Sequence, residues 1–207
     1  ADVGGMPDAA ASDAAGLPVL DAGAGTPAPA LRNPSFERLT GSGAGDLNFS
    51  AFRALDPWYV CLAPTQINFV RVEENVDDKV LPQDGRYFVG FSYMYVVDLT
   101  VPIAQELVTP LKAGQRYAFL VDMRAESDGD DQLGLVVRGG TNLTPCAFLT
   151  DLAETDYLPS GQWTTRCVTF TPSQDLTQIA FLPKNKNGIA IFTRFFIDNI
   201  RTDPSCQ

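Results

Sequence analysis

The sequence contains no histidine. This absence excludes Ser-His-Asp and Cys-His catalytic arrangements, and it excludes every histidine metal ligand. It also removes the side chain best suited to proton transfer near neutral pH. A hydrolase built on this chain would have to use two carboxylates facing each other across a cleft, as glycosidases do. The acidic residues fall mostly in turns and tails, so we predict a protein that is not an enzyme.

Long apolar runs and positive charge are also scarce. No run of eighteen apolar residues occurs, so no transmembrane helix is predicted. The chain has 15 Lys and Arg against 25 Asp and Glu, a net charge of −10. This balance disfavours nucleic acid and anionic membrane surfaces as partners. It suits neutral glycans, cations or other proteins.

Residues 1–30 lack aromatic residues, lysine and arginine, and consist largely of Ala, Gly, Pro and Asp. Such a segment buries too little apolar area to offset the entropy of ordering, so we predict a flexible N-terminal arm. Its few larger apolar side chains are predicted to dock on a sheet edge or on a partner chain. These are Met6, Leu17, Val19 and Leu20.

From Leu31 onward the sequence consists of strand and turn patterns, with no convincing helical period. The predicted strands are rich in β-branched and aromatic residues, and several alternate with period two. They are residues 86–97, 115–125, 133–139, 163–172, 177–183 and 194–201. Strands at short spacing without intervening helices predict one all-β domain, residues 31–207, folded as an antiparallel β-sandwich.

Four motifs follow one another in this domain. NPSFE (33–37) opens it, ELVTPLKAGQRYAFLVDMRA (106–125) joins two strands, GQWTTRCVTFTP (161–172) places a Trp before a strand, and FFIDNIR (195–201) closes it. This order resembles the galactose-binding-like β-jelly rolls, which include several carbohydrate-binding module families of secreted polysaccharide-degrading enzymes. The resemblance covers residues 31–203 and implies a jelly roll with a non-catalytic glycan-binding or adhesive role.

The arm resembles the spacer that follows the lipidated cysteine of many bacterial lipoproteins, especially those of myxobacteria. This resemblance implies an exported protein on an extracellular or outer-membrane surface. The competing hypothesis is a structural subunit of an extracellular or outer-membrane assembly, such as a filament, that is held together through residues 1–30.

In many galactose-binding-like modules the opening acid and the closing Asp bind a structural calcium ion. The matching positions here are Glu37 and Asp198. Calcium takes six to eight hard oxygen ligands, so carboxylates combined with backbone carbonyls suit it. The alternative is that Glu37 pairs with Arg38, Arg194 or Arg201.

Four cysteines, an even number, fit two disulfides and an oxidising compartment, with four buried thiols as the alternative. Their spacing lacks the close pairs of a zinc site. Sequence alone does not choose among the three connectivities. Within the resemblance we predict Cys61–Cys206, which ties the C-terminal tail to an early strand, and Cys146–Cys167, which brackets one loop.

Glycan sites on such folds place aromatic rings against sugars. The candidates here are Trp58, Tyr59, Tyr93 and Tyr95. Tyr93 and Tyr95 are two residues apart, so they share one face of a strand. Packing in the core or at the ends of the sandwich is the alternative for each of these rings, and for Trp163 core packing is favoured.

Overall fold

The computed structural model describes residues 31–39, 55–61, 70–73, 80–93, 101–127, 132–141, 149–186, 193–203 and 206. No helix long and apolar enough to cross a membrane occurs in this part of the chain. Its ten strands are β1 (Tyr59–Val60), β2 (Val70–Glu73), β3 (Phe88–Tyr93), β4 (Ile103–Leu111), β5 (Tyr117–Ser127), β6 (Leu133–Gly140), β7 (Thr150–Glu154), β8 (Trp163–Phe170), β9 (Leu176–Asn185) and β10 (Thr193–Thr202).

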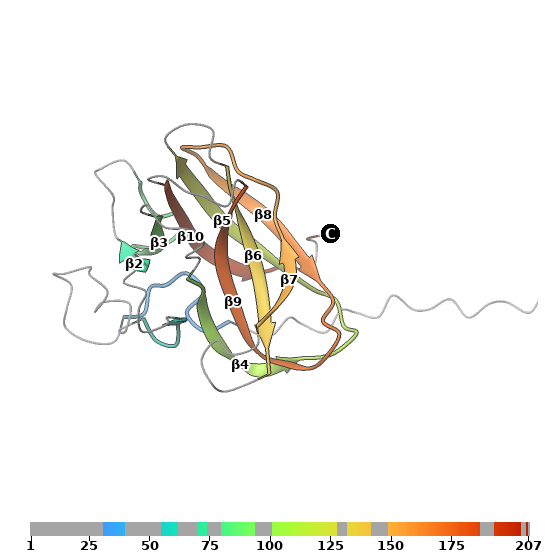
Figure 1. Cartoon of the computed structure of the whole chain (residues 1–207). Helices are drawn as coiled ribbons and strands as arrows, with labels where there is room; N and C mark the ends of the chain where they lie inside the picture. Colours follow the sequence, from blue (N-terminus) through green and yellow to red (C-terminus); the bar gives the residue numbers. More distant parts are fainter. Residues whose placement is uncertain are drawn as a thin grey trace, which may run out of the picture.

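The strands form two five-stranded sheets that pack face to face (Figure 1). One sheet has the order β1-β4-β9-β6-β7, and the other has the order β2-β3-β10-β5-β8. Every strand pair is antiparallel. The prediction of an all-β antiparallel sandwich is therefore confirmed. The arm, with its four docking side chains, lies outside the described residues and stays a prediction.

Six of the longer strands were predicted from the sequence, whereas an edge strand and the two shortest strands were not. The six predicted ranges correspond to β3, β5, β6, β8, β9 and β10. Strand β7 was missed because it lies at a sheet edge with no buried residue, so its sequence carries no period-two signal. Strands β1 and β2 have only two and four residues, too few for a pattern.

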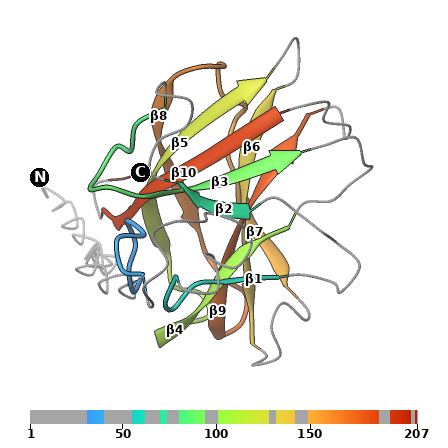
Figure 2. The same ribbon diagram turned by 90° about the vertical axis from the view of Figure 1, so that its left-hand side faces the viewer.

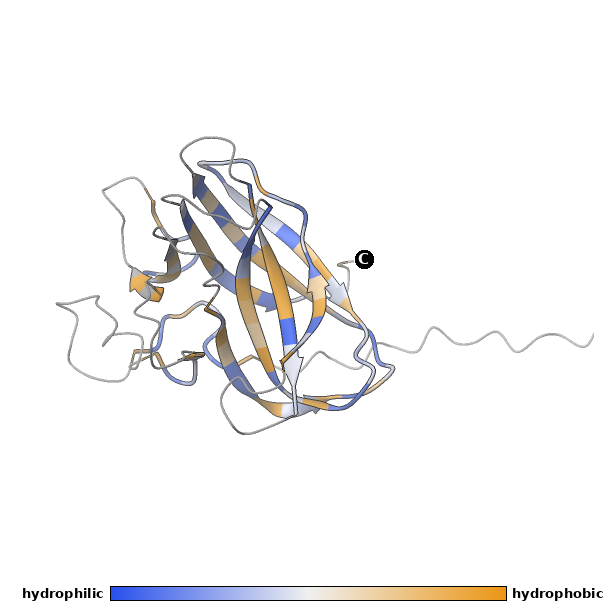
Figure 3. Ribbon diagram, in the orientation of Figure 1, coloured by the Kyte–Doolittle hydropathy of each residue, from blue (hydrophilic) through white to orange (hydrophobic). Residues whose placement is uncertain are grey.

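Strands β6 and β9 lie in the middle of their sheet and are apolar along most of their length (Figure 3). On one face Phe181 of β9 and Val137 of β6 are fully buried in the core between the sheets. On the other face Leu182 and Val136 are also buried, at 2% and 4% exposure. Alternating polarity is therefore weak in these two strands.

The core between the two sheets is aromatic. The ring of Phe119 on β5 meets the ring of Phe181 on β9 edge to face, with 6.4 Å between centroids. Phe181 also contacts Trp58, which in turn contacts Phe36, at 5.9 and 5.3 Å. The indole Nε1 of Trp58 donates to the backbone oxygen of Asn33 at 2.9 Å. The opening segment is thus anchored to the core by two aromatic rings.

The NPSFE segment is a tight turn that joins the start of the domain to its last strand. The amide of Ile200 in β10 donates to the oxygen of Pro34 at 3.0 Å. Asn33 and Phe36 have positive φ angles of 52° and 62°. A positive φ is unfavourable for a bulky residue such as Phe36, and its complete burial offsets that strain.

The predicted disulfide pairing is wrong. Cys167 bonds to Cys206, so neither Cys61–Cys206 nor Cys146–Cys167 forms. Cys167 lies on β8 beside β5, and β10 lies on the other side of β5. The tail that follows β10 crosses β5 to reach Cys167. Cys61 follows β1 in the opposite sheet and is disulfide-bonded too, whereas Cys146 lies outside the described residues.

The aromatic anchor generates a stability prediction. Phe36→Ala should lower the free energy of unfolding by about 3–5 kcal/mol, because it leaves a cavity beside Trp58. Val108, whose side chain is 70% exposed, provides a control, since Val108→Ala should change stability by less than about 0.5 kcal/mol. Urea unfolding followed by tryptophan fluorescence measures both, and equal effects of the two substitutions would contradict the anchor.

Candidate functional site

The last strand contains a bulge that arranges a group of polar side chains. β10 pairs with β5 in register up to Asp198, which lies opposite Asp122, and the pairing resumes at Arg201 (Figure 2). Two residues of β10 therefore oppose one residue of β5. Asn199, inside the bulge, has a φ of 45°, a conformation that asparagine adopts more readily than most residues.

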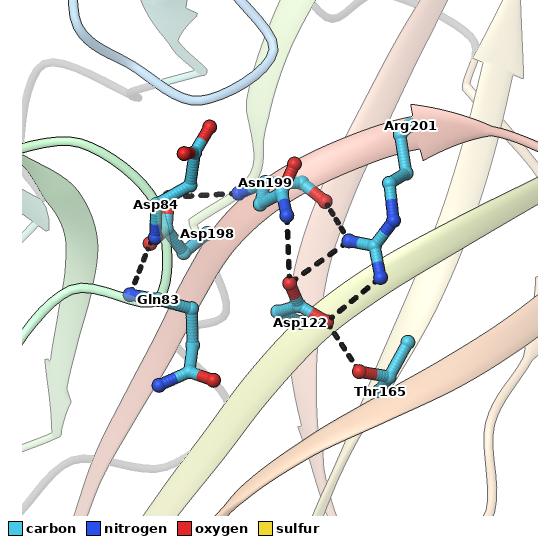
Figure 4. A network of polar contacts seen from close by, with 7 residues as sticks. All are labelled: Gln83, Asp84, Asp122, Thr165, Asp198, Asn199 and Arg201. Atoms are coloured by element: carbon cyan, nitrogen blue, oxygen red, sulfur yellow. Dashed lines mark hydrogen bonds and ion pairs between the residues drawn. The ribbon is translucent and has the colours of Figure 1, made fainter.

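Asp198 is a fully buried carboxylate that binds backbone amides (Figure 4). Its Oδ2 accepts the N–H groups of Gln83 and Asp84 at 2.7 and 3.0 Å, and its Oδ1 accepts the N–H of Asn199 at 2.7 Å. Burial raises the pKa of Asp198 from 3.8 to about 6, while the three amides act to lower it and the charge of Asp84 acts to raise it.

Asp122, on the neighbouring strand, has a different environment (Figure 4). Its Oδ2 accepts from Arg201 Nη1 and Asn199 Nδ2, both at 2.9 Å, and its Oδ1 accepts from Thr165 Oγ1 at 2.5 Å. The charge of Asp122 is therefore compensated by a guanidinium, whereas the hydrogen-bond donors to Asp198 are amides alone.

Glu37 binds the far end of the turn that Asp198 binds. Its Oε1 accepts the N–H groups of Arg86 and Tyr87, both at 2.8 Å. Its carboxyl group lies against Gly85, where any Cβ would come within 2.3 Å of Glu37 Cδ. Only glycine fits this position, which also has a φ of +64°. The first and last parts of the domain thus hold the same turn, residues 83–87.

Of the three arginines considered as partners of Glu37, two pair with other acids, and a pairing with Arg194 stays a prediction. Arg38 forms an ion pair with Asp56 at 2.5 Å, and Arg201 forms one with Asp122.

The residues at this turn are chemically suited to a cation. Asp198 is a buried carboxylate whose pKa is raised by burial and by the nearby charge of Asp84. A divalent cation would compensate the buried charge. Within the described residues no group of three or more His, Cys, Asp and Glu side chains is arranged to hold a metal. Backbone carbonyl oxygens would therefore have to complete a calcium shell, and the ion itself stays a prediction.

A row of paired residues crosses the other sheet on the face that points away from the core. The register aligns Tyr59 of β1, Ala104 of β4, Ala180 of β9, Arg138 of β6 and Asp151 of β7. Directly paired residues share a face, and the residues between them in sequence form the core. Arg138 and Asp151 are joined by an ion pair from Nε to Oδ1.

Gln178 lies in the next row of this outer face, between Glu106 and Gly140. It is fully buried, and neither its amide nitrogen nor its amide oxygen has a hydrogen-bond partner. The hydroxyl of Tyr59 is also buried without a partner. Each unsatisfied group costs about 1–3 kcal/mol, so two of them on one face require an explanation.

The floor of this outer face is apolar. Ala104, Ala180, Leu182 and Val136 are buried, yet they do not belong to the core between the sheets. Because these four side chains have almost no exposed surface, other parts of the chain cover them.

Tyr59 remains a neutral hydrogen-bonding group over the physiological pH range. Burial, and to a lesser extent the charge of Glu106, raises the pKa of Tyr59 to about 12. Its phenol can therefore both donate and accept a hydrogen bond.

The predicted aromatic site is brought together only in part. Trp58 is 3% exposed and belongs to the core, so its prediction as a ligand-binding ring is wrong. Tyr59 is half-buried on the outer face and remains a candidate. Tyr93 pairs through its backbone with Thr193 at the end of β3, and Tyr95 lies outside the described residues.

Trp163 packs against other aromatic side chains, and packing was the alternative that the sequence favoured for this residue. It contacts Phe88 and Phe196 in a small second cluster outside the main core, and its Nε1 donates to the oxygen of Leu81 at 2.8 Å. The segment that precedes β3 is thereby fixed on the outer side of its sheet.

Two residues of the outer face were missed from the sequence, Gln178 and Arg138. No local signal marks them, because each stands alone in an apolar strand. Only the register of β4, β9 and β6 shows that they lie on one face with Tyr59.

Comparisons with known proteins identify the fold. No family model matches the chain, and no curated protein matches it. Among solved structures, an arabinose-bound α-L-arabinofuranosidase, MgGH51, superposes with a TM-score of 0.55 at 16% identity, covering 82% of this chain and 26% of the enzyme. The K1 adhesin domain of Lys-gingipain from Porphyromonas gingivalis W83 gives 0.50 at 10% identity, covering 70% and 89%.

A third similar structure is the module TmCBM61 in complex with β-1,4-galactotriose, with a TM-score of 0.47 at 16% identity, covering 84% of this chain and 97% of the module. Carbohydrate-binding modules of families 16, 22 and 4 also occur among the similar structures. At these identities the comparisons show a shared β-sandwich fold.

The raised pKa of Tyr59 predicts a specific alkaline destabilisation. The ordinary pKa of the phenol is 10.0 and its pKa in the folded protein is about 12, so the unfolded chain loses this proton first. The free energy of unfolding should therefore fall as pH rises from about 10 to about 12. Tyr59→Phe should lack this contribution. Urea unfolding of both proteins across this range tests it, and parallel pH profiles would contradict the burial of the phenol.

Proposed function

We propose that this domain is a non-catalytic glycan-binding module and that the glycan binds the outer face of β4, β9 and β6. The observation that carries this proposal is the amide of Gln178, which lacks any hydrogen-bond partner on a face that also presents Tyr59, Arg138 and Asp151. This amide is fully buried, so it has to be uncovered before a glycan can reach it.

The chemistry of this face matches that of a sugar. Sugar hydroxyls both donate and accept, and so do the Gln178 amide and the Tyr59 phenol. Arg138 donates and Asp151 accepts, and their side chains are 34% and 51% exposed. The apolar floor suits the C–H face of a pyranose ring. An arabinose-bound hydrolase and an adhesin domain share the fold, which supports a carbohydrate or adhesive role without establishing it.

Gln178→Leu separates binding from stability. It replaces an unpartnered amide by an apolar group of similar size, so stability should stay the same or increase. The affinity for glycan should fall at least about tenfold, because the amide hydrogen bonds of the complex are lost. Native affinity electrophoresis in gels containing β-1,4-galactan, arabinan or xylan measures binding, and urea unfolding measures stability.

Arg138→Gln should also weaken binding. Arg116→Gln is the matched control, because Arg116 is exposed in the turn between β4 and β5, away from the outer face. If no polysaccharide retards the wild-type protein, or if Gln178→Leu binds as well as wild type, the proposed site is wrong.

The turn at residues 83–87 is the proposed calcium site. Glu37 and Asp198 would hold the ion together with backbone carbonyl oxygens, and the ion would join the two ends of the domain without taking part in glycan chemistry. The support is the buried, amide-bound carboxylate of Asp198 and the neighbouring charge of Asp84.

Calcium should stabilise the chelator-treated protein. At a concentration of 100 times the dissociation constant the gain is about 2.7 kcal/mol, which appears as a rise in melting temperature. Asp198→Asn should abolish this rise, while Asp156→Asn, at an exposed position outside the turn, should keep it. Differential scanning calorimetry with and without calcium tests this, and an equal rise in both variants would refute the assignment.

We also place the module outside the cell. Disulfides such as Cys167–Cys206 are typical of exported proteins. In this proposal residues 1–30 tether the sandwich to the cell surface, as the lipoprotein-like spacer implies. The alternative of a structural subunit held by the arm stays a prediction, because it depends on residues outside the described part of the chain.

A further inference from the structure

One end of the outer face carries an aromatic ring beside two ammonium groups. The Nζ atoms of Lys184 and Lys186 each lie 5.9 Å from the ring centroid of Tyr157. Cations at this distance from a ring are attracted by its π-electrons, so the three side chains form a cluster. Lys186 is exposed, and Tyr157 and Lys184 are half-buried, so the cluster is open to solvent.

The chain brings Tyr157 to this position because β6 has a glycine there. Gly134 lies opposite Lys184 on β9, and a Cβ on Gly134 would lie 3.2 Å from the oxygen of Thr155 and 3.3 Å from the oxygen of Asp156. The missing side chain lets the segment after β7 approach the sheet closely. Tyr157, the next residue, is thereby held beside the lysines.

The two lysines differ in their hydrogen-bond partners. Lys184 forms an ion pair with Glu154, which raises the pKa of the ammonium group. Lys186 donates to the neutral amide oxygen of Gln132 at 3.1 Å. The charge of Lys186 is therefore not balanced by this hydrogen bond, although the protein has a net charge of −10.

The cluster is continuous with the proposed glycan site. Lys184 and Ala180 share a face of β9, because residues an even number apart along a strand point the same way. Arg138 lies opposite Ala180, so it and Lys184 are roughly 13 Å apart along the strand direction. A ligand that follows the strand from one position to the other would meet Arg138 and Lys184, each paired with an acid, and then Lys186.

We propose that Tyr157, Lys184 and Lys186 form a subsite for an acidic sugar, so that the glycan bound by this face carries uronic acid residues. This inference rests on the proposed glycan-binding function. The ammonium of Lys186 pairs with the sugar carboxylate, Tyr157 supplies an aromatic surface beside it, and Gln132 and Glu154 accept hydrogen bonds from sugar hydroxyls.

The test uses a matched pair of probes and a neutral reference. Oligogalacturonate carries the carboxylates, its methyl ester keeps the same sugar rings and linkage without the charge, and β-1,4-galacto-oligosaccharide is the neutral reference glycan. Titration calorimetry should give at least tenfold tighter binding of oligogalacturonate than of its methyl ester, and added salt should narrow that difference. The Lys186→Gln substitution should remove most of the preference for oligogalacturonate. The control is Lys112→Gln, at an exposed lysine in the β4–β5 turn, which should keep that preference.

The outcomes separate this inference from the proposed function. Equal binding of the acid and its ester, or an unchanged preference in Lys186→Gln, overturns the acidic subsite while glycan binding stands. Binding of dextran sulfate as tight as that of oligogalacturonate overturns the assignment to uronic acids, because it shows a preference for any polyanion. If none of the sugars binds, the proposed function and the subsite fail together.

Discussion

The contacts that join the first and last segments of the domain depend on the bulge in β10. By setting two residues of β10 against one of β5, it directs Asp198 to the turn at residues 83–87 and Arg201 to Asp122. It also leaves the amide of Ile200 to hold the opening segment through Pro34. A regular strand would point alternate residues to opposite faces without interruption, so it would not place all three contacts together. The domain's first and last segments therefore meet at a single irregular position.

The two outer faces of the sandwich have opposite characters. On the β2-β3-β10-β5-β8 sheet, Trp163, Phe88 and Phe196 pack under the segment that precedes β3, and Asp122 is satisfied by three neighbouring side chains. On the β1-β4-β9-β6-β7 sheet, Gln178 and the Tyr59 hydroxyl have no partners. Polar groups that are already satisfied gain little from a ligand, whereas unsatisfied ones gain a full hydrogen bond. Because of this contrast, the glycan site is proposed on the β1-β4-β9-β6-β7 sheet.

Fold class was predictable from the sequence, and the site largely was not. Period-two alternation is clear in β5, whereas β3 and β10 were recognised by their aromatic and β-branched residues, since Phe88 and Phe196 are buried on the outer face as well. Glu37 and Asp198 were singled out through a resemblance alone, and the calcium ion that they were predicted to bind stays a prediction. The predictions of the disulfide pairing and of Trp58 as a ligand-binding residue were wrong for a common reason, because both depend on which strands are neighbours. Cys167 and Cys206 are 39 residues apart in the sequence, and they meet because β8 and β10 lie on the two sides of the same strand, β5.

Gln178 illustrates why such a site leaves no trace in the local sequence. Leucine would fill the same volume in β9 without leaving two buried polar atoms unpaired, so the requirements of packing do not explain the amide. A residue that breaks a local rule without an evident gain in the folded chain is a candidate for a functional role, and this is why the glycan site is proposed at Gln178. The charges on this face point the same way only at one residue. Arg138 and Lys184 are each paired with an acid, Asp151 and Glu154, whereas Lys186 donates to the neutral amide of Gln132 and is the cation that an anionic partner would meet.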